Sequence, residues 1–286
     1  MPARLTSILI PGRRGIASLE TGGEALIEPL PAGLTEGAAF HAEIVREPLA
    51  ESGRAKLAKG RVIEAAPCPG PTLAERLGVS PAGPFARDIF EEMGWSELLE
   101  EAATGEIAFA GGSLRMSLTP AMTLFDVDGG LLPDALAEAG AAAAARAILR
   151  FGIAGSIGLD LPTVSDRTRR QAAAAAVDAL LPQPFERTAV NGFGFLQIVR
   201  RRERASIPEI VQGDPAGAAA RALMRRAERA AGHGPATISA AGAVAARIEA
   251  QPDWIARLER TLGVPVSLQA DAGLAISAGH VHRIQG

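Results

Sequence analysis

The sequence predicts a mixed α/β protein made of several parts, and three observations point to this class. Short apolar segments separated by Gly and Pro turns fill the first 66 residues, as in a region of β-strands. Strand-like and helix-like segments alternate between residues 106 and 212, which is typical of helices packed on a sheet. A further run of helices and short strands follows "QGDPAG" and fills residues 213–286.

The N-terminal third is expected to hold short strands followed by helices. Residues 4–30 read as strands joined by Gly-containing turns, and residues 38–66 add two more, "AFHAEIV" and "GRVIEA". The loop-rich residues 68–85 include one short helical stretch and are the best candidate for a junction. Residues 85–105 are expected to form one or two helices, with Gly94 as a break.

The centre of the chain has the clearest signals. Two strands, "SLRMSLT" and "AMTLFDVD", precede a helix that Pro133 opens and Gly152 closes. The strand "SIGLDLP" ends in Asp160, and the helix after it has Ser165 as its expected N-cap and Pro182 as its stop. "GFGFLQIVRRR" is a further strand. The last part is expected to be a small α/β domain, with helices in 217–231, 241–250 and 253–263 and strands in 236–239, 264–270 and 280–284.

Composition excludes several classes. Apolar residues make up 48% and charged residues 21%, as in ordinary globular proteins, and no apolar run reaches the length of a membrane span. The apolar stretch near the N-terminus is too short for a signal peptide, so a cytoplasmic location is expected. A single cysteine, Cys68, excludes an intramolecular disulfide and a zinc site built on a Cys pair. The net charge of −3 gives no global signature of nucleic-acid binding.

Three aspartates form the main chemical signal. Asp126 and Asp128 are two residues apart on one strand, so their side chains share a face, and Asp160 ends a second strand. If the three carboxylates converge at one sheet edge, they offer hard oxygen ligands for Mg²⁺, or Mn²⁺ in its place. Such an ion favours phosphodiester hydrolysis. The alternative is that Asp128 and Asp160 are turn residues at strand ends, and the spacing alone leaves both interpretations open.

A family resemblance favours the metal site. From about Ile89 to Ser206, "IFEEMGWSELLEEA", "GGSLRMSLTPAMTLFDVDGG", "ILRFGIAGSIGLDL" and "GFLQIVRRRERAS" resemble, in this order, segments of the ribonuclease E/G family. "IARLERTLGVPVSLQADAGL" is similar to the small C-terminal domain of that family, and "AEIVREPLAESGRAKL" resembles the end of its OB-fold domain. The resemblance implies an RNase H-like region over 1–105 with an OB-fold remnant at about 38–66, a DNase I-like catalytic domain over 106–212, and a small α/β domain over 213–286.

The resemblance also implies an activity, which is Mg²⁺-dependent cleavage of single-stranded RNA to leave 5′-phosphate and 3′-hydroxyl ends. Asp126 and Asp160 match the two metal-binding aspartates, and Asp128 stands where the family has an assisting Asn. Several family features are missing. Too few residues separate the first strands from "AEIVREPL" for a complete five-stranded barrel, the 5′-sensor motif is not recognisable, and no cysteine pair supports a zinc link. Any homo-oligomer is therefore expected to form without zinc. Thr163 replaces an acid and Leu131 a basic residue.

Arginines and phenylalanines are candidates for RNA contact. Arg200 and Arg202 lie on an expected strand, and Arg167, Arg169 and Arg170 begin the helix after Asp160, where they suit phosphate binding. The alternative for each is a solvated surface charge. Phe193 and Phe195 are expected to pack in the core rather than stack on bases.

Two rival functions remain open at this stage. One is an RNA-binding relative of the ribonuclease E/G family that keeps the aspartates without catalysis. The other is a metal-dependent phosphoesterase that acts on a different substrate.

Overall fold

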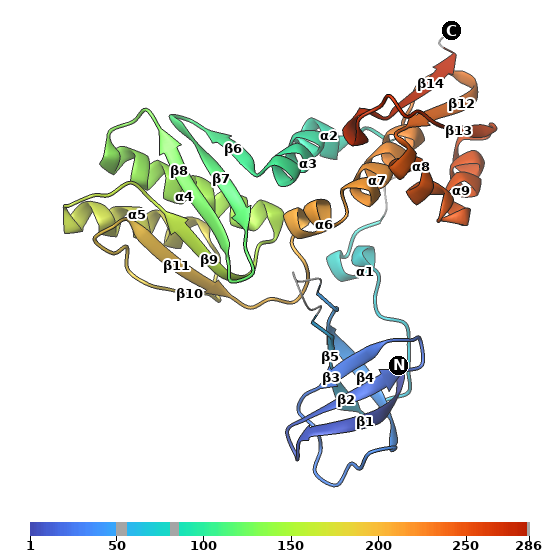
Figure 1. Cartoon of the computed structure of the whole chain (residues 1–286), viewed down its shortest axis with the longest axis horizontal. Coiled ribbons are helices and arrows are strands. Elements are labelled where there is room, and N and C mark those ends of the chain that lie inside the picture. The colour runs from blue at the N-terminus through green and yellow to red at the C-terminus, as the bar shows by residue number, and fades with distance from the viewer. Residues whose placement is uncertain (50–55, 81–85, 285–286) are drawn as a thin grey trace. The chain divides into compact units, whose positions relative to one another are not determined.

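The computed structural model describes residues 1–49, 56–80 and 86–284. The described elements form a closed barrel, a six-stranded sheet and a three-stranded sheet, with helices around the last two (Figure 1). The predicted mixed α/β class is confirmed. Two compact units are present, one combining Met1–Gly78 with Gly105–Ser206 and the other combining Val79–Thr104 with Ile207–Gly286.

The barrel contains five strands in the order β1-β2-β3-β5-β4, and pairing of β1 with β4 closes it. Strands β3 and β5 are parallel to each other. Leu5, Ala17 and Ile27 are buried in its core. The strands are β1 (Pro2–Ile10), β2 (Arg14–Leu19), β3 (Glu24–Ile27), β4 (Ala39–Arg46) and β5 (Ala58–Ile63). The short helix α1 (Leu73–Leu77) follows.

This barrel corrects the expectation of a remnant at 38–66. The first three strands, which the sequence suggested were separate from β4 and β5, pair with them and complete a five-stranded barrel. The five strands fit between Pro2 and Ile63 because each has only four to nine residues. Within the described part of 1–105, the strands all belong to this barrel, so the expected RNase H-like layered region is not formed there.

The six-stranded sheet has the order β10-β11-β9-β8-β7-β6. Strands β8 and β9 are parallel, and the other neighbouring strands run antiparallel. The strands are β6 (Glu106–Phe109), β7 (Gly112–Leu118), β8 (Thr123–Gly129), β9 (Gly155–Asp160), β10 (Glu186–Arg187) and β11 (Phe195–Arg200). The helix α4 (Pro133–Phe151) connects β8 to β9, and α5 (Arg167–Leu180) packs beside α4 in one layer (Figure 1).

The two faces of this sheet differ. Phe125 and Val127 point toward the helices and are buried, and α4 approaches so closely that a Cβ on Gly140 would lie 2.5 Å from Val127 Cγ1. Alternate residues point to the opposite face, because successive side chains of a strand alternate. We call this opposite surface the carboxylate face. It carries the side chains of Arg115, Asp126, Asp160 and Phe195.

The helix ends follow the expected capping chemistry, with one correction. Pro133 is the first residue of α4, and Gly152 closes that helix in the left-handed conformation at φ 65°, as predicted. The N-cap of α5 is Asp166 and not Ser165. The Asp166 carboxylate accepts hydrogen bonds from the backbone N–H groups of Thr168 and Arg169, so it satisfies two donors at the helix start.

The second unit is a three-stranded sheet, of order β13-β12-β14, with helices around it. Leu223, Ile238, Val244 and Ile248 are fully or almost fully buried in its core. Its elements are α2 (Ile89–Glu92), α3 (Trp95–Thr104), α6 (Ile207–Gly213), α7 (Pro215–Glu228), β12 (His233–Ala240), α8 (Gly242–Glu249), α9 (Pro252–Leu262), β13 (Val266–Ala270), a 3₁₀ turn (Ile276–Ala278) and β14 (His280–Ile284).

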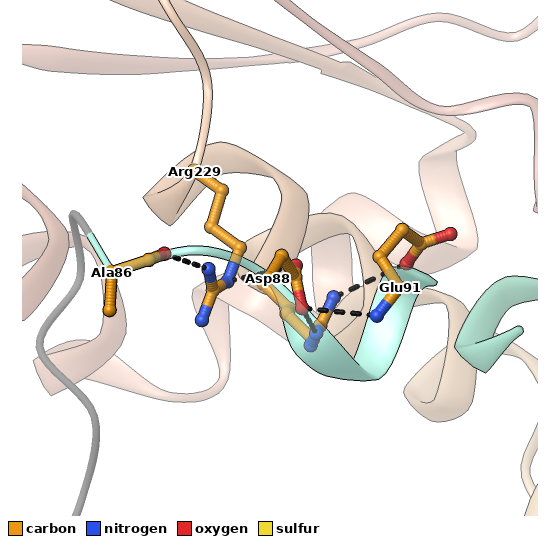
Figure 2. A network of polar contacts seen from close by, with 5 residues as sticks. Ala86, Asp88, Glu91 and Arg229 are labelled. Atoms are coloured by element: carbon orange, nitrogen blue, oxygen red, sulfur yellow. Dashed lines mark hydrogen bonds and ion pairs between the residues drawn. The ribbon is translucent and has the colours of Figure 1, made fainter. Parts of the chain in front are cut away.

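A polar network fastens α2 to α7, as Figure 2 shows for Asp88, Arg229 and Ala86. Asp88 caps α2 and forms ion pairs with Arg225 at 2.5 Å and with Arg229 at 3.1 Å, while Arg229 also donates to the Ala86 carbonyl. Desolvation opposes ionisation of Asp88, but the hydrogen bonds from the Glu91 N–H and from Arg225 hold its pKa below the ordinary value. Residues 79–104 therefore belong with the C-terminal part, whereas the sequence analysis had placed them in the N-terminal region.

Among the described helices, none combines the length and the apolar character that crossing a bilayer requires.

Candidate active site on the carboxylate face

Asp126 and Asp160 form the centre of the candidate site. They are Cα partners in the parallel pairing of β8 with β9. Directly paired residues project to the same face, and neighbouring strands lie about 4.7–4.9 Å apart. Asp126 is half-buried and Asp160 is exposed, so both carboxylates are open to solvent. The pairing that the sequence could only suggest is thus present in the sheet.

Asp128 stands beside this pair and not within it. It lies on the same face as Asp126, about 6.6–6.8 Å further along β8. Its Cα partner is Ser113 of β7, while β9 ends opposite Asp126. Within the described residues, no group of three or more His, Cys, Asp or Glu side chains is close enough to hold an ion. The three carboxylates therefore do not converge as expected. Asp126 and Asp160 form a pair, and Asp128 lies beside them.

Arg115 is a site residue that the sequence analysis missed. It is the Cα partner of Asp126 on the other side of β8, so it projects beside the aspartate pair. Its Nε lies 3.0 Å from Glu106 Oε1, and 66% of its side chain is exposed. The hydrogen bond with Glu106 raises the pKa of Arg115, and the charges of Asp126 and Asp128 act in the same direction. Strand alternation could have placed Arg115 on the polar face, but the register with β8 is not readable from sequence.

The three arginines of α5 are only partly available to a ligand. Arg170 donates to the backbone carbonyls of Val164 and Ser165, and Arg169 lies 3.6 Å from a carboxylate oxygen of Asp134. Arg167 is exposed at the first residue of the helix. The helix N-terminus, which the sequence suggested for phosphate, already holds the carboxylate of Asp166. Hydrogen bonds that this carboxylate accepts from the backbone N–H groups of Arg169 and Thr168 lower the pKa of Asp166.

Arg200 and Arg202 lie away from the aspartate pair. Because β11 runs antiparallel to β9, Phe195 is opposite Asp160 and Arg200 is opposite Gly155. Five residues along a strand correspond to about 16–17 Å. Arg200 also points to the helix-covered face, where it donates to the Ile153 carbonyl, and desolvation lowers its pKa. Arg202 lies near Gly155 at the same end of β9. The structure does not bring these two arginines to the candidate site.

The two phenylalanines have different environments. Phe195 is half-buried, and its ring lies over Gly158, where an added Cβ would be 2.8 Å from Phe195 Cζ. Phe195 therefore packs against its own sheet on the carboxylate face, and the expectation of core packing is met only in part. Phe193 is 83% exposed, so the expectation of core packing is wrong for this residue. Phe193 lies in the turn before β11 and not in the strand, so it does not share the burial pattern of that strand. The sequence analysis had placed it in the strand.

The donor set of the pair fits a small divalent cation. Mg²⁺ is usually held by one or two carboxylates, and water and substrate phosphate oxygens complete its coordination. Asp126 and Asp160 supply two hard oxygen donors on a solvent-open face, and Arg115 supplies a positive charge next to them. This combination suits a phosphate-containing ligand better than a neutral one.

Fold and site together define a layered α/β protein with a paired-aspartate site on the uncovered face of its sheet. No family model matches the chain, and the comparison with curated proteins found no match either.

Proposed function

We propose that this protein is a metal-dependent endoribonuclease. It would hydrolyse phosphodiester bonds of single-stranded RNA and leave 5′-phosphate and 3′-hydroxyl ends. The observation that carries the proposal is the direct pairing of Asp126 with Asp160 on adjacent parallel strands. These are the two residues that the resemblance to the ribonuclease E/G family assigns to metal binding.

Asp126 and Asp160 are the residues that would hold Mg²⁺, with Mn²⁺ as an alternative. A bound divalent ion supplies Lewis acidity and a water of lowered pKa. The carboxylates themselves accept hydrogen bonds from a water molecule and can orient it for in-line attack. Asp128 adds a negative charge near the pair, which increases the local attraction for a cation.

Arg115 has the position of a phosphate-binding residue. Arg115 is the Cα partner of Asp126, and its guanidinium offers several N–H donors, of which Nε donates to Glu106. An Arg at this point can hold a phosphate oxygen of the substrate and offset the negative charge that the three aspartates create. Arg167, at the start of α5, is exposed and is a second candidate for RNA contact.

The barrel supports the choice of a single-stranded nucleic acid as the substrate. Its five strands, with the order β1-β2-β3-β5-β4, suit an OB-fold-like barrel, and barrels of that type bind oligonucleotides on one face. A more complete barrel than the sequence suggested strengthens the case for RNA binding by this chain.

One cleavage assay tests the proposal. A 5′-monophosphorylated single-stranded RNA is incubated with Mg²⁺ and with wild type, Asp126→Asn or Asp160→Asn. We expect cleavage by wild type and a loss of at least about 100-fold in each variant, as for removal of a group that acts directly on the reaction. Asp253→Asn is the matched control, because it removes the same charge from an exposed position in the first turn of α9.

Three outcomes decide between the functions. Absence of cleavage by wild type, or equal cleavage by the two site variants, would refute the catalytic assignment. RNA binding without cleavage would support the non-catalytic RNA-binding relative. Hydrolysis of a small phosphodiester in place of RNA would support the phosphoesterase.

A further inference from the structure

We propose that Phe193 is a base-stacking residue that positions an unpaired nucleobase next to the Asp126–Asp160 pair. This inference rests on the proposed function, because it names how the RNA substrate is held at the same site. It assigns the specificity for single strands to a side chain outside the barrel.

The first observation is the exposure of the ring. Phe193 has 83% of its surface exposed, and no large hydrophobic residue is more exposed in the part of the chain that the structure describes. A phenyl ring exposed to water forgoes the favourable burial of its apolar surface. A ring in this position gains that contact area only when a ligand covers it.

The second observation is that the backbone of this residue is firmly held. Asn191 Oδ1 accepts hydrogen bonds from the N–H groups of Phe193 and Phe195, at 2.9 and 3.0 Å. Thr163 Oγ1 donates to the Phe193 carbonyl at 3.3 Å. Gly194 has φ 92°, and a Cβ there would lie 2.0 Å from the Leu161 carbonyl oxygen. The turn therefore presents the ring in a defined place, which reduces the entropy lost on binding.

The third observation is the location of the turn. Phe195 is the Cα partner of Asp160, and the Leu161 N–H donates to the Gly194 carbonyl at 3.2 Å. The Phe193 backbone is two residues from Phe195, so it lies at most about 7 Å from it. The exposed ring is thus attached at the end of β9 that carries the catalytic aspartate. A nucleotide that flanks a phosphate held at the pair is within its reach.

The chemistry of the ring selects the ligand. A phenyl group has no hydrogen-bonding atoms, so it recognises the flat face of a base and not its edge. All four bases present such a face, and stacking therefore tolerates sequence variation. The face is accessible only when the base has left a helix, because paired bases are stacked on their neighbours. Phe193 would thus favour single-stranded substrates with little preference for sequence.

The test compares wild type with Phe193→Ala and Phe193→Trp on single-stranded RNA. We expect Phe193→Ala to lower kcat/KM by about 5- to 160-fold, the range for loss of one base–aromatic stack, mainly through KM. Phe193→Trp should restore it. Phe90→Ala is the matched control, because it removes a ring that is 67% exposed on α2. Thermal unfolding of Phe193→Ala should equal that of wild type, which separates the effect from instability.

Substrates with one abasic nucleotide identify the contact. The base is removed in turn at each of the two positions on either side of the cleaved bond. At the stacked position, wild type and Phe193→Ala should cleave at the same rate, because neither can stack. If Phe193→Ala cleaves intact RNA like wild type, or loses the same factor on every abasic substrate, the inference is overturned.

A binding measurement separates this inference from the proposed function. In the Asp160→Asn background, RNAs that carry 2-aminopurine at one position at a time are titrated with protein. Binding should quench the 2-aminopurine fluorescence at one position, and adding Phe193→Ala should remove this quenching. Quenching that depends on Phe193 in a protein whose wild type does not cleave would refute only the proposed nuclease. Cleavage without any dependence on Phe193 would refute only the stacking role.

Discussion

Asp126 and Asp160 occupy matched positions on two adjacent parallel strands, β8 and β9, so that two carboxylates leave neighbouring backbones on one face of the sheet. Like charges on neighbouring residues repel each other, and a bound cation would offset that repulsion. Arg115 flanks the pair on the β7 side and Phe195 on the β11 side. This row of side chains is the basis of the predictions that follow.

The two aspartates should behave as one unit. If both hold the same ion, loss of either one removes most of the function of the other. The double variant Asp126→Asn with Asp160→Asn should therefore cleave no more than about tenfold slower than the poorer single variant, as seen for residues that act together. Single-turnover rates measured over a range of Mg²⁺ concentrations check this. Losses that multiply in the double variant would mean that the two residues act independently.

Asp128 should tune cation affinity without being essential. Because it lies outside the pair, Asp128→Asn should keep most of the maximal rate. Removal of its negative charge should raise the Mg²⁺ concentration for half-maximal activity about two- to fivefold, an effect of the size expected for one exposed charge. The effect should shrink at high salt, because exposed charges are screened. A loss as large as that in Asp126→Asn would place Asp128 among the direct ligands.

Arg115 should contribute to RNA binding through a phosphate. Replacing Arg115 with Gln should raise KM, and the slope of log affinity against log salt should fall by about one, the change expected when one phosphate contact is lost. Arg247→Gln is the matched control, because Arg247 is a similarly exposed arginine paired with Asp214 in the other unit. An unchanged salt slope in Arg115→Gln would mean that Arg115 serves only its ion pair with Glu106.

Glu28 should make the stability of the barrel depend on pH. Hydrogen bonds from Lys59 and then Arg14 lower the pKa of Glu28 from its ordinary value of 4.5 to about 2. A group whose pKa is lower in the folded state stabilises that state above its unfolded pKa, and this stabilisation disappears as pH falls through the folded value. Glu28→Gln should therefore destabilise the barrel at pH 7, and the difference from wild type should vanish between about pH 4.5 and pH 2.

Hydrogen exchange of the barrel strands gives the readout for Glu28, because it reports on the barrel separately from the rest of the chain. Glu43→Gln is the control, since Glu43 also pairs with an arginine, Arg61, but is more exposed than Glu28. A difference between Glu28→Gln and wild type that stays constant across this pH range would contradict the assigned pKa.

Much of the fold could be predicted from local sequence signals. Pro133 and Gly152 bounded α4 correctly, and Gly94 separates α2 from α3 as expected. These elements are predictable because capping and backbone preferences act over only a few residues. The short strands β6 and β10 and the helix α6 were missed, since they contain too few residues for a periodic pattern.

The candidate site was predictable in its parts but not in its assembly. Asp126 and Asp160 were visible as carboxylates on strands bounded by Gly or Pro. The places of Arg115 and Arg200 were not visible, because the register of a strand against its neighbours depends on contacts between residues far apart in sequence. The exposure of Phe193 likewise depends on contacts of its backbone, because its N–H donates to Asn191 Oδ1 and its carbonyl accepts from Oγ1 of Thr163, which is far away in sequence.

The sequence by itself determined most of the longer strands and helices, where most of these end, and which residues can supply oxygen ligands, because these properties follow from local backbone preferences and side-chain chemistry. Only the tertiary structure decided that five N-terminal strands close into a barrel. It also decided that Asp126 pairs with Asp160 and that Asp128 stands apart from them. The physical reason is that strand order and register are set by long-range hydrogen bonding and by burial of one sheet face, and a linear pattern does not specify either of them.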